Sequence, residues 1–155
     1  MTQHASEPFA LHVVPRYAEV DQQGVVFNGH YLTWFDEAST ALFDHVGLPY
    51  PVLTSWNLDV QVVHAELDYL APVRWRDQVR VAVTCESTGT TSFTLRFDVL
   101  RSDGDGTDLT AVRGRSVYVV VSTDDWTKRA LPTAFRDALT SVAGQRSTIG
   151  GTVDP

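Results

Sequence analysis

The sequence predicts an α+β fold in which a five-stranded antiparallel sheet wraps around one long helix. Three observations support this prediction: one stretch with helical spacing over residues 28–46, runs of two-residue period after residue 59, and tight turns between those runs. Consecutive strands joined by tight turns pair antiparallel. A single apolar helix beside such a sheet is covered best when the sheet curves around it.

The N-terminal third contains one strand and the long helix. A strand-like stretch covers residues 9–20, and a turn follows over residues 21–24. In the helix, apolar residues recur at spacings of three and four: Tyr31, Trp34, Phe35, Ala38, Ala41 and Leu42. The opposite face is polar: Thr33, Asp36, Glu37, Thr40 and Asp44. Leu32 and Phe43 widen the apolar stripe, so we expect the helix to be covered on more than one side.

The remaining strands follow in chain order. An extended run over residues 59–70 ends at Pro72, and residues 79–84 and 93–99 alternate apolar and polar side chains. Two Asp-Gly pairs in residues 102–106 predict a hairpin turn, after which a long strand covers residues 110–122. A short closing helix is expected over residues 132–142, because proline is favoured near a helix start.

Length and composition exclude several classes of protein. The chain has 155 residues, 12 basic and 19 acidic, for a net charge of −7. This length predicts one domain over residues 9–144, with a flexible segment 1–8 and a disordered tail 145–155. The acidic balance argues against nucleic-acid binding. No apolar run approaches the roughly 20 residues of a membrane span, and no secretory signal is recognisable, so we expect a cytoplasmic protein without membrane contact.

Metal and disulfide chemistry are not expected. Cys85 is the single cysteine, which excludes an intramolecular disulfide and a four-cysteine zinc site. The five histidines have no mutual ligand spacing. His64 and Glu66 match half of a zinc-deaminase motif whose second half is absent.

The stretch with chemical potential covers residues 21–31, DQQGVVFNGHY. It places the carboxylate of Asp21 and a glycine turn just ahead of a largely buried helix. Unpaired N–H groups at a helix start carry about half a positive charge and can hold a carbonyl oxygen that becomes negative during acyl transfer. An alternative remains open, in which Asp21 only satisfies turn amides and Asn28 only caps the helix.

This stretch resembles the signature of the hotdog-fold acyl-CoA thioesterases, the 4-hydroxybenzoyl-CoA thioesterase-like family. The matching residues are Asp21, Gly24, Val25, Val26, Tyr31, Trp34 and Phe35. The similarity continues at Tyr69, Pro72 and Asp77 and in residues 127–132, so that it covers about residues 9–140.

The resemblance implies hydrolysis of an acyl-CoA or aryl-CoA thioester, with coenzyme A as part of the substrate and no further cofactor. It implies that Asp21 is catalytic, as general base or as nucleophile, and that the backbone amide of Asn28 holds the carbonyl oxygen. The expected substrate contacts are Gly24, Val25, Val26, His30 and Tyr31. Relatives carry other residues at Asn28, so a role for its side chain stays open, as does a role for Glu19. The family also implies a homodimer or homotetramer with sites at the interface.

Other functions remain open beside hydrolysis of acyl-CoA. One alternative is a non-catalytic hotdog protein that binds acyl or aryl thioesters, because a fold does not fix a function. The other is a thioesterase acting on acyl carrier protein, which the acidic surface disfavours because that carrier is itself acidic. A hotdog dehydratase or hydratase would act on the same thioesters, but the sequence has no His–Asp or His–Glu pair at the spacing that those families use.

Two interpretations are open for each of several residues. His30 either positions substrate or water or is a surface or capping residue, and Asp36 and Glu37 are a second carboxylate pair that fits a solvated or dimer-facing helix side better. Four aromatic residues line either a pocket or the core: Phe27, Trp34, Tyr50 and Trp56. Six basic residues flank strand ends where they could meet the phosphates of coenzyme A: Arg74, Arg76, Arg113, Arg115, Lys128 and Arg129. The sequence does not choose among them.

Overall fold

The computed structural model describes residues 7–144. Residues 1–6 of the predicted flexible segment 1–8 and the whole predicted tail 145–155 lie outside this range. The strands are β1 (Ala10–Val13), β2 (Leu58–Tyr69), β3 (Val79–Thr88), β4 (Ser92–Ser102) and β5 (Asp108–Ser122). The helices are the 3-10 turn η1 (Tyr17–Glu19), α1 (His30–His45), α2 (Tyr50–Ser55) and α3 (Thr133–Ser141).

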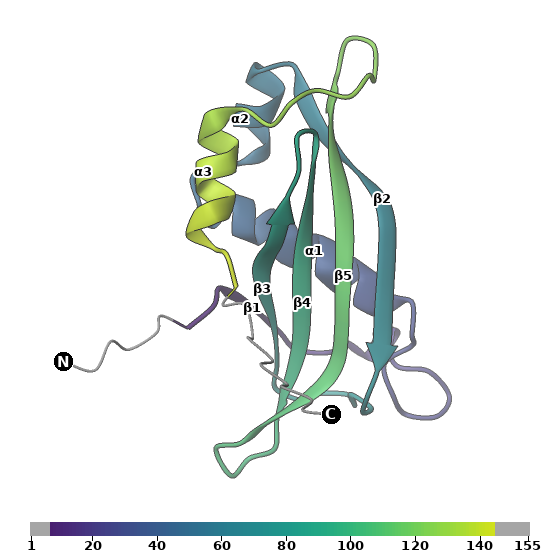
Figure 1. The fold of residues 1–155 in the computed structure, drawn as a ribbon. Coiled ribbons are helices and arrows are strands. Elements are labelled where there is room, and N and C mark those ends of the chain that lie inside the picture. The colour runs from purple at the N-terminus through teal and green to yellow at the C-terminus, as the bar shows by residue number, and fades with distance from the viewer. Residues whose placement is uncertain (1–6, 145–155) are drawn as a thin grey trace, which may run out of the picture.

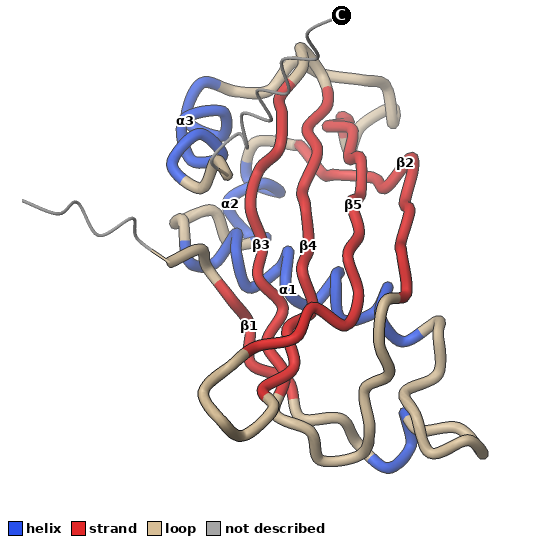
Figure 2. Tube along the Cα trace, turned by 60° about the horizontal axis from the view of Figure 1, so that its bottom comes forward, coloured by secondary structure: helices blue, strands red, loops and turns tan. Residues whose placement is uncertain are grey.

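The five strands form one antiparallel sheet in the order β1-β3-β4-β5-β2. The long helix α1 crosses one face of this sheet (Figures 1 and 2). This arrangement confirms the predicted α+β fold, a curved sheet around one long helix. No helix within residues 7–144 is both long and apolar enough to cross a membrane.

Three local predictions need correction. The first strand has four residues instead of the predicted 9–20, because Pro15 lacks the N–H that would continue the ladder. Helix α1 begins at His30 with Gly29 as its N-cap, two residues later than predicted, so Asn28 does not cap it. Helix α2 was not predicted: Pro49 and Pro51 suggest a break, yet they stand at the cap and first turn of a helix, where proline fits.

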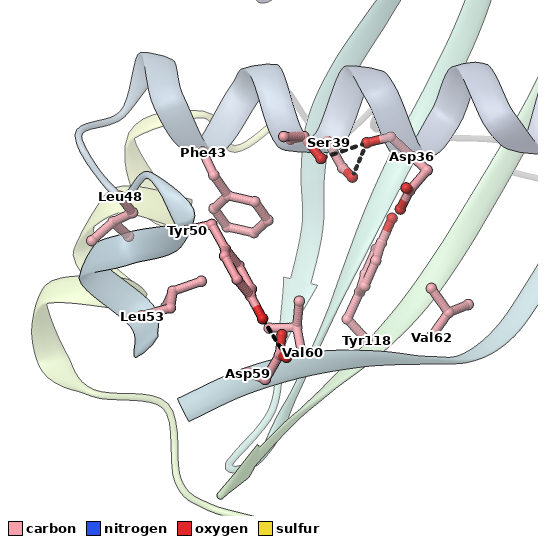
Figure 3. A pocket seen from close by; sticks show the side chains of 11 residues that line it. Asp36, Ser39, Phe43, Leu48, Tyr50, Leu53, Asp59, Val60, Val62 and Tyr118 are labelled. Atoms are coloured by element: carbon pink, nitrogen blue, oxygen red, sulfur yellow. Dashed lines mark hydrogen bonds between the residues drawn. The ribbon is translucent and has the colours of Figure 1, made fainter. Parts of the chain in front are cut away.

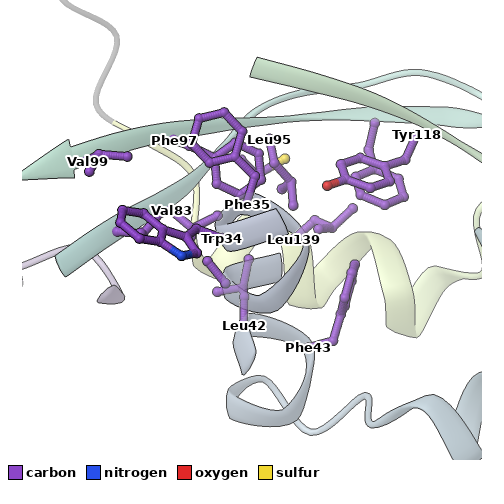
Figure 4. Close-up of a cluster of buried hydrophobic side chains, with 14 of the residues drawn as sticks. Trp34, Phe35, Leu42, Phe43, Val83, Leu95, Phe97, Val99, Tyr118 and Leu139 are labelled. Carbon is purple, nitrogen blue, oxygen red and sulfur yellow. The ribbon is translucent and has the colours of Figure 1, made fainter. Parts of the chain in front are cut away.

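The core lies between α1 and the sheet. Helix α1 buries Trp34, Phe35 and Leu42, and the ring of Phe35 stacks on Phe97 at 4.4 Å between centroids (Figure 4). A Cβ at Gly114 would lie 2.6 Å from the Phe35 ring, so glycine in β5 permits this close approach. The polar face of α1 is exposed, as predicted. Leu32 is 43% exposed, but Phe43 is buried, with its ring 5.5 Å from that of Phe135 in α3. The expected cover beyond the sheet side is therefore present at Phe43 and absent at Leu32.

The sheet edge formed by β2 and the outer face of the sheet differ in character. β2 is an edge strand of 12 residues with apolar side chains in solvent, among them Val62 and Val63. The face of the sheet away from α1 carries ion pairs between neighbouring strands, such as Arg115–Glu66 and Arg113–Asp98, both at 2.8 Å. The outer face is therefore a solvated charged surface, whereas the β2 edge is apolar and has no strand partner on its outer side within residues 7–144.

Candidate active site

A tight turn holds Asp21 at its start. Val20 pairs with Val26, the amide of Asp21 donates to the carbonyl of Val25 at 2.9 Å, and the amide of Gly24 donates to the carbonyl of Asp21 at 3.0 Å. Gly24 has φ +79°, a left-handed conformation that glycine adopts without strain. The Asp21 carboxylate accepts the amide of Gln23 through Oδ1 at 2.8 Å. Its Oδ2 accepts no hydrogen bond from residues 7–144 and is available to water or substrate.

The two residues just ahead of α1 have backbone donors that are unused within residues 7–144. The amide of His30 donates to the carbonyl of Phe27 at 3.1 Å, which closes the turn into the helix. Within the described chain, the amides of Asn28 and Gly29 donate to no protein acceptor. The carbonyl of Asn28 accepts the hydroxyl of Tyr69 from the end of β2 at 3.1 Å. Unused amides at a helix start are the donors that an oxyanion needs.

A cavity of about 320 Å³ lies beside these donors. It unites four of the predicted site residues, Val25, Val26, Asn28 and Tyr31, with the segment that leaves β2: Tyr69, Leu70, Ala71 and Pro72. Asp21, Gly24 and His30 do not line it. His30 lies at the first position of α1, half-buried, with its ring edge-to-face on Phe27 at 5.9 Å.

Tyr31 forms a neutral wall of this cavity. Its side chain is buried, and burial raises the pKa of Tyr31 to about 12 despite a hydrogen bond with the backbone of Val73. The ring meets that of Tyr69 edge-to-face at 5.8 Å. Tyr31 therefore keeps its proton at neutral pH and contributes shape and a fixed hydroxyl rather than charge.

Glu19 is a buried carboxylate whose role the sequence left open. It accepts the indole N–H of Trp34 at 2.7 Å, and the amide and Nε of Arg16 at 2.9 and 3.2 Å. Its carbonyl accepts the amide of Phe27 at 2.9 Å. Glu19 thus ties the turn that carries Asp21 to the side of α1. Trp34 is the sequence signal that could have revealed this role, because a buried indole N–H on the core face of a helix requires a hydrogen-bond acceptor.

We expect Glu19→Gln to lower the free energy of unfolding at pH 7 by roughly 1–3 kcal/mol. Burial pushes the pKa of Glu19 upward, but the hydrogen bonds from Arg16 and Trp34 outweigh it and hold that pKa below its ordinary value of 4.5. At pH values between the pKa of Glu19 in the folded protein and its pKa in the unfolded chain, the unfolded chain binds more protons. The contribution of Glu19 to the free energy of unfolding is therefore present above about pH 4.5 and is lost as the pH falls through the folded-state pKa.

Denaturant unfolding at pH 7 and at pH 3.5 measures this difference. The difference in free energy of unfolding between wild type and Glu19→Gln should be smaller at pH 3.5 than at pH 7. The control Glu37→Gln, on the exposed face of α1, should have the wild-type free energy of unfolding at both pH values. An equal difference at the two pH values would contradict stabilisation by the charged form of Glu19.

A second cavity, of about 260 Å³, lies near the other end of α1, between α1, α2 and the start of β2 (Figure 3). The hydroxyl of Tyr50 donates to Asp59 there at 3.0 Å, and Asp36 lies at the helix side of the cavity. Of the four aromatic candidates, Tyr50 lines this cavity, Trp34 belongs to the core, and Phe27 and Trp56 lie on the surface. Phe43, Leu53, Val60 and Tyr118 supply apolar lining.

The residues present do not form a metal centre in the described part of the chain. No group of three His, Cys, Asp or Glu side chains in residues 7–144 is placed to hold an ion. His64 lies on β2 at 3.7 Å from Glu66, on a surface strand position.

One long helix held by a curved five-stranded antiparallel sheet is the hotdog fold. The sequence model of the Thioesterase superfamily matches residues 23–107, and the chain belongs to this superfamily. It is an enzyme of the thioester hydrolase class.

Known proteins agree with this assignment. A protein of Aquifex aeolicus, whose name gives esterase as an inferred activity, is 27% identical over 96 residues, 62% of this chain and 75% of that protein. The 1,4-dihydroxy-2-naphthoyl-CoA thioesterase of Synechocystis superimposes with a TM-score of 0.77 at 20% identity, over 86% of this chain and 96% of that one. A 4-hydroxybenzoyl-CoA thioesterase variant complexed with 4-hydroxybenzoyl-CoA gives 0.79 at 18% identity, over 86% and 99%. The two structures share the fold.

Proposed function

We propose that this protein hydrolyses an acyl-CoA or aryl-CoA thioester to the free carboxylic acid and coenzyme A. The observation that carries the proposal is the pair of unused amides at Asn28 and Gly29, beside a cavity and next to the turn that presents Asp21. The relatives named as CoA thioesterases support coenzyme A as the carrier.

In this mechanism the thioester carbonyl oxygen accepts hydrogen bonds from the helix-start amides. A water molecule attacks the carbonyl carbon while Asp21 accepts its proton, and the tetrahedral intermediate expels the thiolate of coenzyme A, which takes up the proton. Alternatively, the Asp21 carboxylate attacks first, the thiolate leaves, and water hydrolyses the mixed anhydride. An oxyanion donor contributes about 10²–10³ to turnover and a general base about 10²–10⁴.

The predicted substrate contacts fit this arrangement as supports for the thioester. Val25, Val26 and Tyr31 line the 320 Å³ cavity with apolar surface, and Gly24 shapes the turn that carries Asp21. His30 is adjacent to the unused amides, where it would position water or substrate.

We also propose that the protein acts as a homodimer or larger homo-oligomer that pairs through β2. Within residues 7–144 no strand pairs with the outer edge of β2, and this edge carries exposed apolar side chains, a combination that favours pairing with a second strand. Both cavities lie along the seam between α1 and β2, at opposite ends.

Release of free thiol across a panel of acyl-CoA, aryl-CoA and acyl-carrier-protein thioesters tests the proposed activity. We expect thiol release from CoA thioesters and weaker release from the carrier-protein thioesters. Release from no substrate would contradict hydrolysis and favour the binding protein, whereas release from carrier-protein thioesters alone would favour the second alternative.

A further inference from the structure

The structure separates the six basic residues that sequence alone left equivalent. Arg113 and Arg115 lie on the outer sheet face in ion pairs with Asp98 and Glu66. Arg129 pairs with Asp125, and Lys128 lies beyond the end of β5, at the opposite end of its own protomer's sheet from the 320 Å³ cavity. Arg74 and Arg76 follow the cavity wall at Pro72 directly, and within residues 7–144 neither side chain has a carboxylate partner within 4.0 Å.

The loop that carries these two arginines is held in place against the Asp21 turn. The amide of Val26 donates to the carbonyl of Val73 at 2.8 Å, and Val25 pairs with Arg74. Asp77 accepts the amide of Arg74 at 2.8 Å. From the other side, Arg101 donates to the carbonyl of Pro72 at 2.6 Å. The loop is therefore a preformed surface adjoining the candidate active site.

Exposed aromatic rings accompany the two arginines. Trp75 is 46% and Tyr17 80% exposed, and their rings meet edge-to-face at 5.9 Å. The guanidinium of Arg76 lies 4.1 Å from the Trp75 ring centroid. Arg76 has φ +65°, a left-handed conformation that is strained for an L residue, and such strain clusters at active sites and ligand-binding loops.

We propose that Tyr17, Arg74, Trp75 and Arg76, here called the Arg74–Arg76 cluster, bind the phosphorylated adenine nucleotide end of the coenzyme A substrate. The inference rests on the proposed function and adds to it the site of the carrier. Arginine matches phosphate oxygens with two parallel N–H donors, and an aromatic face accepts a stacked base. The chain has a net charge of −7, and phosphates require a local positive charge. Arg74 and Arg76, which have no carboxylate partner within residues 7–144, provide that charge beside the Asp21 turn.

The test compares an acyl-CoA with the matching acyl-pantetheine, which has the same thioester but no nucleotide. In the double variant Arg74→Gln/Arg76→Asn, asparagine tolerates the left-handed backbone. We expect KM for acyl-CoA to rise at least about tenfold, with kcat and KM for acyl-pantetheine within about twofold of wild type. The matched control, Arg96→Gln/Arg115→Gln, removes two charges from the outer sheet face and should leave both KM values unchanged.

Equal KM values for the two substrates in wild type, or an equal rise of both KM values in the double variant, would contradict nucleotide binding by the Arg74–Arg76 cluster. Neither result would contradict hydrolysis of the thioester. Calorimetric titration with free coenzyme A separates the two hypotheses further, because it needs no turnover. Even if no thioester were hydrolysed, wild type should bind coenzyme A at least about tenfold more tightly than the double variant. Equal affinity, or no binding by wild type, would contradict the inference.

Discussion

Asp21→Asn is expected to lower kcat at least about a hundredfold while the protein stays folded. Asparagine keeps an oxygen where Oδ1 of Asp21 accepts the Gln23 amide, so the turn retains its hydrogen bond. It removes the negative charge, and with it both the base that would accept a proton from water and the nucleophile that would form an anhydride. Steady-state thiol release gives kcat, and circular dichroism with thermal unfolding reports the fold.

Asp105→Asn is the matched control for this substitution. Asp105 accepts the amide of Thr107, two residues on, at 2.9 Å, which is the same local contact in the hairpin between β4 and β5. Its kcat should equal that of wild type. Full activity of a folded Asp21→Asn protein would show that the unpaired oxygen of Asp21 takes no part in the chemistry.

Label in Asp21 after a single turnover in oxygen-18 water would identify its carboxylate as the nucleophile. Attack by the carboxylate places label in Asp21 when the anhydride is hydrolysed at the side-chain carbon, whereas direct attack by water places the label in the product acid alone. The structure is compatible with both, because Oδ2 has no partner in residues 7–144.

The fold followed from the sequence because hydrophobic periodicity records burial. The alternation in β3 and β4 and the three- and four-residue spacing in α1 correspond to the buried sets that the structure shows. The errors occur where a local signal competes with a nonlocal one. Proline before α2 indicated a break, and the apolar run after Phe9 continued past the point where pairing with β3 ends at Val13.

The candidate site was predictable only in part, for a related reason. Residues 21–31 stand together in the chain, so their motif identifies the turn and the helix start. The contacts that complete the site join distant segments: Tyr69 reaches Asn28, and Arg74 pairs with Val25. Nothing local distinguishes Arg74 from Arg113; only the fold shows that Arg113 has a carboxylate beside it on the neighbouring strand.

Val63→Lys should convert the proposed homodimer into a monomer and reduce kcat/KM at least about tenfold. Val63 is 59% exposed near the middle of β2, at the irregularity where the pairing with β5 shifts. If two copies pair through antiparallel β2 strands, a residue near the middle of the strand lies close to its own copy across the two-fold axis. Two lysines brought together there repel each other, and lysine on an edge strand opposes pairing.

The matched control is Val14→Lys, which adds the same charge at a valine of similar exposure, 54%, beyond the end of β1. It should remain an oligomer by analytical ultracentrifugation at micromolar concentration, with wild-type activity. A Val63→Lys protein that sediments as wild type does would contradict pairing through β2.

The expected loss of activity in Val63→Lys follows from where the two cavities lie. The 320 Å³ cavity contains Tyr69 at the end of β2, and the 260 Å³ cavity contains Asp59 and Val60 near its start. Antiparallel pairing about the middle of β2 brings the end of one strand beside the start of its partner, so the unused amides of one copy come next to the second cavity of the other. A monomer that retained full kcat/KM would therefore show that each protomer holds a complete site, and that pairing through β2 serves stability alone.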